Sequence, residues 1–331
     1  MLKEILISPF NCLNCIEFEE IVSYLSNNME KLRLNLTNLY PQAKLSMIRK
    51  CTNLITFNVN INIYRDRLNE YVYSSSDYNR CISTLVANSP NLESLCIQHW
   101  NINSLCIPKL CTLTLLKVLD LSHCEYIIIT DIVPIVTITT RLQTLRLYGI
   151  AIYDPLFNAL GRYCLDPRCI EFSKCSDGCT PPAIQYMISN CVLLEFLYLG
   201  SKLVYTNTIL DTLANYCNRE HTLQLAEVTD YGILTILDNC KLLSDLLIYK
   251  TTNLSCPGIS LSTRVCPQLS SLFLNYTDHI TINQLYTILS NCPKLTILTL
   301  LRCLLLHKDV MSIMSIKEHC LSEQVNIRFD L

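Results

Sequence analysis

A nine-residue pattern with leucine at its first, fourth and sixth positions recurs along this chain about every 26 residues, and it usually ends in cysteine. Clear copies are LKVLDLSHC (116–124) and LTILTLLRC (295–303). A unit this short cannot bury its apolar face by itself, so successive units must stack on one another. The period therefore predicts a solenoid, an architecture that presents an extended surface to another macromolecule.

Each unit is predicted to contain a short strand followed by a helix. The Leu-x-Leu core alternates with period two, which is typical of a strand with one buried face, such as that of Leu119 and Leu121. Further along the chain, ITINQLYTILSNC (280–292) spaces its apolar residues along one side of a helix. The expected N-caps of three such helices are Thr281, Thr229 and Thr130, whose hydroxyls can accept a backbone N–H. Pro134 is expected in a first helical turn, where a missing N–H costs little.

Cysteine is unusually frequent, with 20 residues in a chain of 331. Small secreted scaffolds pair their cysteines in disulfides, whereas this chain is long and half of its residues are hydrophobic. Seven cysteines recur at intervals of 23 to 28 residues, each near the end of a predicted helix: Cys164, Cys191, Cys217, Cys240, Cys266, Cys292 and Cys320. One cysteine per repeat at a fixed slot indicates a stacked core position, so we expect reduced, buried thiols.

Composition excludes several functional classes. Only 16% of the residues are charged, the net charge is −2, and Lys and Arg are scattered, so no basic nucleic-acid footprint is expected. No apolar run approaches the ~20 residues that a membrane-spanning helix needs. The first residues, MLKEILISPFNCLNC, do not resemble a signal peptide. The sequence therefore favours a cytoplasmic or nuclear protein that binds neither nucleic acid nor membrane.

The repeats predict one solenoid over residues 1–331, built from about 11–13 units of ~26 residues. The expected parts are degenerate N-terminal capping repeats (1–53), an insertion loop (60–80), regular repeats (85–320) and a C-terminal capping strand (321–331). The insertion is polar and rich in tyrosine, and insertions in solenoids map to surface loops.

The unit LSDLLIYKTTNLSCPGISLSTRVC and its neighbours resemble the cysteine-containing leucine-rich repeat of F-box-like proteins. The resemblance implies an α/β horseshoe, with a concave parallel sheet and helices on the convex side. It also implies a substrate-recognition role in SCF-type ubiquitin-ligase assemblies, with a Skp-type adaptor and a cullin as partners. No recognisable F-box is expected ahead of the repeats, because 2–10 fits a degenerate strand and 16–28 a following helix. The alternative is a regulator similar to ribonuclease inhibitor, which occludes an enzyme.

The candidate binding site lies on the concave face, at the strand positions that alternate with the buried leucines. Aromatic residues recur there: Tyr148, Phe196, Tyr198, Tyr249, Phe273 and Tyr276. Polar residues accompany them: Arg146, Glu171, Gln224 and Asp245. Aromatic side chains and arginine are typical anchors of protein interfaces, and the mixed charges favour a protein or peptide over a polyanion. Alternatively, the aromatics reflect only the preference of strands for Tyr and Phe.

The sequence contains no convincing catalytic or metal-binding motif. Four cysteines lie close together in the sequence, at Cys164, Cys169, Cys175 and Cys179. Their spacing lacks the paired arrangement of zinc knuckles, so no metal is expected. His99 and His123 occupy equivalent strand ends and are expected to lie near each other on a solvated rim. Without a GxSxG motif or a glycine-rich phosphate loop, the sequence predicts neither an enzyme nor a cofactor.

Overall fold

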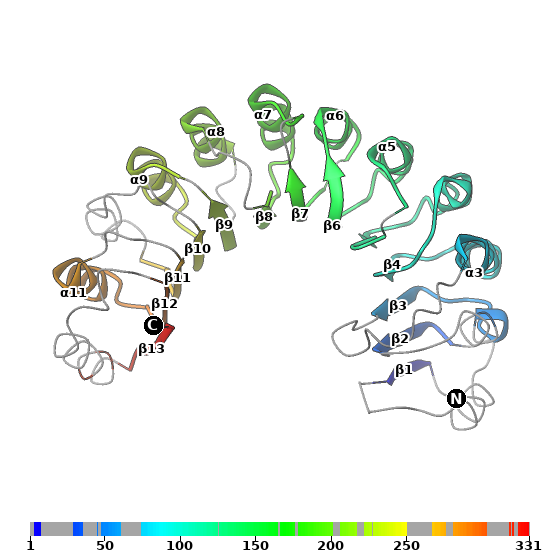
Figure 1. Cartoon of the computed structure of the whole chain (residues 1–331), viewed down its shortest axis with the longest axis horizontal. Coiled ribbons are helices and arrows are strands. Elements are labelled where there is room, and N and C mark those ends of the chain that lie inside the picture. The colour runs from blue at the N-terminus through cyan, green and yellow to red at the C-terminus, as the bar shows by residue number, and fades with distance from the viewer. Residues whose placement is uncertain are drawn as a thin grey trace. The chain divides into compact units, whose positions relative to one another are not determined.

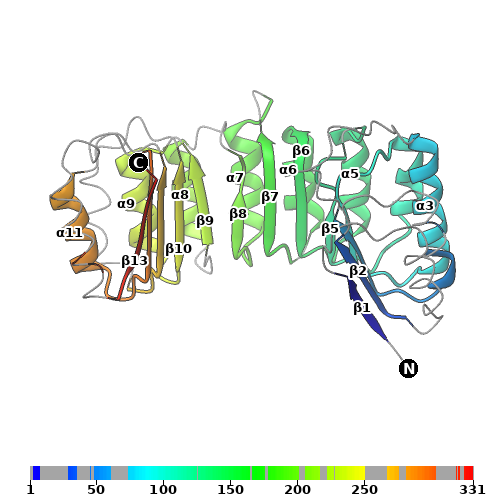
Figure 2. The same ribbon diagram turned by 60° about the horizontal axis from the view of Figure 1, so that its bottom comes forward.

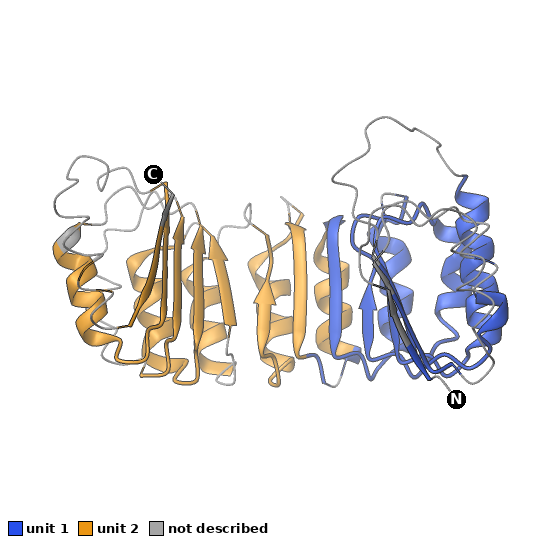
Figure 3. Cartoon of the chain, turned by 90° about the horizontal axis from the view of Figure 1, so that it is seen from below, with its two compact units in different colours: residues 1–151, 163–167 blue, residues 152–162, 168–331 orange. Residues whose placement is uncertain are grey.

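The structure is a computed structural model of the chain. It describes residues 3–7, 29–35, 45, 48–60, 74–124, 126–164, 166–175, 178–200, 206–216, 222–226, 228–249, 267–275, 281–302, 318, 320 and 324–330. The chain divides into two compact units (Figure 3). The first comprises Met1–Ala151 and Tyr163–Pro167, and the second comprises Ile152–Arg162 and Arg168–Leu331. One continuous solenoid over 1–331 stays a prediction from the sequence.

The first unit is a parallel sheet whose strands pair in chain order. Its strands are β1 (Glu4–Ile7), β2 (Lys31–Asn35), β3 (Thr56–Asn60), β4 (Ser94–Ile97), β5 (Val118–Asp120) and β6 (Thr144–Ile152, in this unit up to Ala151). Its helices are α3 (Ser75–Asn88), the short 3₁₀ helix η1 (Ser104–Cys106), α4 (Ile107–Leu110) and α5 (Ile129–Ile138). In Figure 1 the helices of this unit lie together on one side of its strands.

The second unit repeats the same plan, and its strands also pair in parallel and in chain order. Its strands are β7 (Cys169–Cys175), β8 (Phe196–Tyr198), β9 (Thr222–Ala226), β10 (Asp245–Tyr249), β11 (Ser271–Asn275), β12 (Ile297–Leu301) and β13 (Asn326–Asp330). Its helices are α6 (Asp154–Tyr163, in this unit up to Arg162), α7 (Pro181–Asn190), α8 (Asn207–Tyr216), α9 (Asp230–Asn239) and α11 (Ile282–Asn291). Figure 2 shows the strands β9 and β10 side by side, with the helices behind them.

The core of each unit lies between the sheet and the helices. In β10, Leu246 and Ile248 are completely buried, whereas Asp245, Leu247 and Tyr249 between them are partly exposed. β11 follows the same alternation. The Leu-x-Leu positions therefore point toward the helices, and we call the opposite side of the sheet the open face. This is the predicted α/β leucine-rich-repeat fold, and the prediction is confirmed.

A recurring backbone contact sets where each strand begins. The carbonyl oxygen of Lys117 accepts the N–H groups of Gln143 and Thr144, at 2.7 and 2.9 Å. In the second unit, the carbonyl of Ser270 accepts the N–H groups of Thr296 and Ile297, at 2.8 and 3.0 Å. The same arrangement recurs at other carbonyls: Lys3, Glu30, Ile55, Glu93, Arg168 and Ser244. Each strand is thus aligned by an acceptor of the preceding repeat.

The cysteine that ends a predicted helix occupies the helix C-cap. Cys191, Cys240 and Cys292 cap α7, α9 and α11, and each donates its N–H to the carbonyl four residues earlier, at 2.8 to 2.9 Å. All three side chains are buried, as predicted. Ser89 and Thr139 occupy the same slot after α3 and α5. Their buried hydroxyls are hydrogen-bonded, since an unsatisfied hydroxyl in that position would cost about 1–3 kcal/mol.

The fourteen described cysteines form no disulfide. Eleven of them are buried: Cys51, Cys81, Cys96, Cys106, Cys124, Cys164, Cys175, Cys191, Cys240, Cys292 and Cys320. Burial raises the pKa of the Cys106 and Cys164 thiols to about 12 from the ordinary 9.0. Cys217 and Cys266 lie outside the described residues.

Two of the three predicted N-caps are confirmed. The hydroxyls of Thr229 and Thr281 accept the N–H groups of Gly232 and Gln284. Thr130 is wrong as an N-cap, because α5 already begins at Ile129. There the Asp131 carboxylate accepts the Ile128 N–H at 3.2 Å, and this contact marks the start of the helix.

The positions predicted for Pro134 and for the insertion also need correction. Pro134 lies inside α5 rather than in its first turn, so the helix lacks one interior hydrogen bond. Residues 75–80 of the predicted insertion loop (60–80) belong to α3, which begins at Ser75. Residues 61–73 lie outside the described part of the chain.

The alternation in β10 predicts very different costs for two adjacent leucines. Leu246→Ala should lower the free energy of unfolding by about 2–5 kcal/mol, because it leaves a cavity in the core. Leu247→Ala, on the open face, should cost less than about 1 kcal/mol. Urea unfolding followed by circular dichroism measures both. Equal losses in the two variants would contradict the assignment of the faces.

Burial of the thiols predicts slow alkylation in the native chain. At pH 8, iodoacetamide should label Cys106 and Cys164 about 1,000-fold more slowly than in urea, because only the thiolate reacts and burial raises the thiol pKa from 9.0 to about 12. The partly exposed Cys111 is the internal control and should label faster. Mass spectrometry of the digested chain resolves each site.

Raising the pH above 9 should destabilise the fold, because the thiols of the unfolded chain ionise there before the buried thiols of the folded chain do.

Candidate functional site

The open face of the second unit carries its residues in rows, because the strands are in register. Between β7 and β11, the central row places one residue from each strand side by side: Glu171, Tyr198, Gln224, Leu247 and Phe273. Neighbouring strands lie about 4.8 Å apart, so these five residues span roughly 19 Å. All five side chains are partly exposed. The register therefore converts residues scattered over a hundred positions of sequence into one line across the sheet.

Aromatic and leucine side chains gather at one part of this face. The rings of Tyr249 and Phe273 contact each other, with centroids 5.1 Å apart and planes inclined by 38°. Leu247 lies next to Phe273 in register. We call Tyr198, Leu247, Tyr249 and Phe273 the aromatic platform. Phe196 lies in the adjacent row, beside Cys169 and Thr222.

The platform stabilises the uncharged form of its tyrosines. Burial, and secondarily the neighbouring Cys175, raise the pKa of Tyr198. Burial raises the pKa of Tyr249 as well, with a further contribution from Tyr198. Both phenols are therefore neutral at physiological pH, and their rings offer apolar faces together with a hydroxyl group.

Two carboxylates flank the platform and are held in place by neighbours. Glu171 accepts a hydrogen bond from the Cys169 thiol at 3.2 Å, and it lies directly beside Tyr198 in register. Asp245 accepts hydrogen bonds from the hydroxyls of Ser244, at 2.6 Å, and Thr222, at 3.4 Å. Oriented carboxylates beside neutral aromatic rings suit a cationic or hydrogen-bond-donating group on a partner.

In the first unit, Arg146 lies opposite Asp120 in register. Asp120 alternates with the buried Leu119 and Leu121, so the pattern predicts that it is exposed; this is wrong, because its side chain is buried. Its carboxylate accepts the Gln98 amide at 2.7 Å and the Ser122 N–H at 2.9 Å. Asp120 therefore organises the strand end and leaves Arg146 as the partly exposed residue of that pair.

Tyr148 belongs to a stack of rings at the carboxyl end of the strands. The rings of His99 and His123 stack in parallel, with centroids 4.4 Å apart and an angle of 2° between planes. Tyr148 continues the stack beside His123, at 6.4 Å. The predicted proximity of the two histidines is confirmed. Both have left-handed backbone conformations, with φ of 60° and 61°, which favour a tight turn after each strand.

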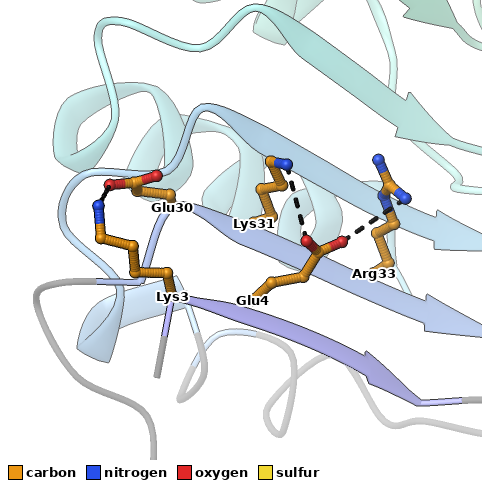
Figure 4. A network of polar contacts seen from close by, with 5 residues as sticks. All are labelled: Lys3, Glu4, Glu30, Lys31 and Arg33. Atoms are coloured by element: carbon orange, nitrogen blue, oxygen red, sulfur yellow. Dashed lines mark hydrogen bonds and ion pairs between the residues drawn. The ribbon is translucent and has the colours of Figure 1, made fainter. Parts of the chain in front are cut away.

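The first strands carry charges that pair with one another (Figure 4). The Glu4 carboxylate lies 3.6 Å from both the Lys31 ammonium and the Arg33 guanidinium, and Lys3 contacts Glu30 at 2.6 Å. These side chains are substantially exposed, so each pair contributes at most about 1 kcal/mol. The basic groups are matched by acids, and they form no uniformly positive surface here.

Tyr276 lies outside the described residues, and Asn275 holds the last open-face position of β11. Among the residues that the structure describes, no three His, Cys, Asp or Glu side chains are grouped to hold a metal ion. Within that same part of the chain, no helix has both the length and the apolar character needed to cross a membrane. Whether the open-face residues bind a partner stays a prediction.

Sequence reasoning missed the importance of Leu247. Alternation places Leu247 on the open face, but the sequence pattern indicates only the aromatic and polar residues there as candidate contacts. The register shows that it lies between Gln224 and Phe273, within the aromatic platform. The sequence signal for it is a leucine at an exposed strand position, where a polar residue is expected.

Comparison with known proteins supports the fold. No protein-family model matches the chain. A solved yeast structure, the complex of Rad7 and Elc1, matches with a TM-score of 0.64 and 15% identity over 86% of this chain and 73% of that one. An internalin (inlF) from Listeria monocytogenes matches with a TM-score of 0.51 and 15% identity, over 100% of this chain and 87% of that one. At these identities the likeness concerns the fold alone.

Two glycines next to the candidate site predict a contrast in stability. Gly149 and Gly200 both have left-handed backbones, with φ of 82° and 85°. A Cβ on Gly149 would lie 3.0 Å from the His123 side chain, whereas on Gly200 it would lie 2.6 Å from the backbone carbonyl oxygen of Ser173, a much closer contact with a rigid group. Gly149→Ala should therefore cost about 1–2 kcal/mol, and Gly200→Ala about 2 kcal/mol more. Chemical denaturation measures both, and equal costs would exclude the backbone clash.

Proposed function

We propose that this chain is a non-catalytic module that binds a protein or peptide on the open face of its second unit. The observation that carries the proposal is the aromatic platform on a parallel sheet. Parallel sheets usually have both faces covered, because their strands are apolar on both sides. Here helices cover one face, while Tyr198, Tyr249 and Phe273 remain partly exposed on the other.

The chemistry of this surface supports a protein partner. Clustered exposed apolar side chains tend to mark interaction sites. Tyrosine and phenylalanine bury a large area with little loss of conformational entropy, so they often dominate binding energy. The charges on this face include Glu171 and Asp245, which would repel a polyanion such as RNA. The yeast structure with the same fold contains Rad7 bound to a second protein, Elc1.

The more specific role is substrate recognition in an SCF-type ubiquitin-ligase assembly. The support is the resemblance of the cysteine-containing repeats to those of F-box-like proteins. In such an assembly a Skp-type adaptor and a cullin would be recruited, and the chain would work in the cytoplasm or nucleus. The open face would then hold the substrate, while another surface contacts the adaptor.

The aromatic platform predicts which substitutions abolish partner binding. Tyr198→Ala, Tyr249→Ala and Phe273→Ala combined should reduce binding at least about 100-fold, since large interface anchors each contribute about 1–2 kcal/mol or more. The measurement is affinity purification from native cells with quantitative mass spectrometry, followed by titration of the purified partner. Co-elution of a Skp-type adaptor and a cullin tests the more specific role.

A matched control separates binding from folding. Tyr231 is 54% exposed on α9, on the helical side of the same unit, and Tyr231→Ala should leave binding unchanged. Each variant must keep the wild-type melting temperature. If a folded triple variant retained every partner of the wild-type chain, the proposed binding face would be wrong.

A further inference from the structure

We propose that the open face of the second unit recognises an extended segment in which a lysine or arginine lies three or four residues from a large apolar side chain. This inference rests on the function proposed above and specifies the chemistry of the partner. It follows from the charges on the face, from the neighbours of Tyr198 and from the spacing of the strands.

The charges are distributed unevenly across this face. The strands β8–β11 are all described, and their open-face positions contain one carboxylate, Asp245, and neither lysine nor arginine. β7 adds Glu171 on one side, with Lys174 exposed at its end. On the other side, β13 carries the exposed Arg328 in the central row. A basic side chain of a partner would therefore be repelled by Arg328 on the β13 side and attracted to the carboxylates of Glu171 and Asp245.

Tyr198 provides a place for such a cation. It lies next to Glu171 in register, so a cation over the Tyr198 ring would also reach that carboxylate. A ring and an acid together are suited to lysine and arginine, because the ring face attracts the charge and the carboxylate compensates for lost hydration. An anion would meet the same carboxylate and be repelled.

The opposite end of the site is apolar. Leu247, Tyr249 and Phe273 form a continuous part of the platform, and the rings of the two aromatics are in contact. A large apolar side chain of the partner would cover them. Burying such a side chain contributes roughly 1.5–3 kcal/mol relative to exposure, which is enough to anchor a short segment.

The distance between these two places sets the spacing within the partner. Two strand spacings separate Tyr198 from Leu247, and three separate it from Phe273. At about 4.8 Å per spacing this is roughly 10–14 Å, and an extended chain advances about 3.3 Å per residue. The basic and apolar residues of the partner should therefore be three or four positions apart.

Phage display of random dodecapeptides on the full chain tests the proposal. Enriched peptides should share a Lys or Arg three or four residues from Leu, Ile, Met, Phe or Trp. In fluorescence anisotropy with a synthetic copy, Glu171→Gln should weaken binding about fivefold, as expected for losing one charge partner of a partly exposed pair. Phe273→Ala should weaken it at least about tenfold, and Tyr231→Ala should have no effect.

A double-mutant cycle identifies the contact itself. Replacing the basic residue of the peptide by norleucine should cause at least the same fivefold loss, because the contact with the Tyr198 ring is lost as well, and should remove the effect of Glu171→Gln. Because norleucine changes the peptide alone, this arm remains informative if Glu171→Gln lowers the stability of the protein. Additive losses would show that Glu171 does not contact the basic residue, and would overturn the proposal.

The other outcomes distinguish this inference from the proposed function. Enriched peptides without a basic residue, whose binding is lost in the triple aromatic variant, would overturn the inference and leave protein binding on this face intact. Peptides that bind the triple variant as tightly as the wild type would contradict both. If the wild-type chain enriched no peptides beyond those enriched by the triple variant, the inference would be overturned. The proposed function would then still be tested by the affinity purification.

Discussion

The sheet of each unit depends on a shared hydrogen-bond acceptor at the start of its strands. In the second unit, the carbonyl of Ser270 accepts two successive N–H groups from the next repeat, those of Thr296 and Ile297. A donor pair on one acceptor leaves no freedom to slide by a residue, and a slip of one residue would exchange the buried and open faces of a strand. The burial of the leucines, the rows on the open face and the position of every candidate contact follow from this register.

The helix ends show why cysteine recurs at the same position in successive repeats. The C-cap slot is fully enclosed, and a thiol fills it as a small apolar group with no strong demand for hydrogen bonds. Where the slot holds Ser89 or Thr139, the hydroxyl finds a backbone partner. A thiol is only a weak hydrogen-bond donor, so cysteine tolerates small differences in geometry between repeats. The abundance of cysteine therefore reflects packing, in agreement with the raised pKa values of Cys106 and Cys164.

The sequence predicted the parts of the structure that follow from periodicity. Alternation placed Leu246 in the core and Tyr249 on the open face, because a period of two leaves a strand with only two sides. It failed where one side chain serves the backbone locally. Asp120 is buried because it accepts hydrogen bonds from Gln98 and Ser122, and α5 begins at a contact made by Asp131. Such contacts depend on three-dimensional proximity. For the same reason, the sequence identified the aromatic residues but not which of them touch.

The regular register has a consequence for how such a surface measures what it binds. Every repeat contributes one residue to each row, at the fixed spacing of the strands. The number of strands in a row sets the length of segment that the row can contact, and the residue at each open-face position sets which side chain is accepted there. Single substitutions at positions such as Gln224 or Leu247 can therefore change specificity at one position without disturbing the buried leucines that maintain the register.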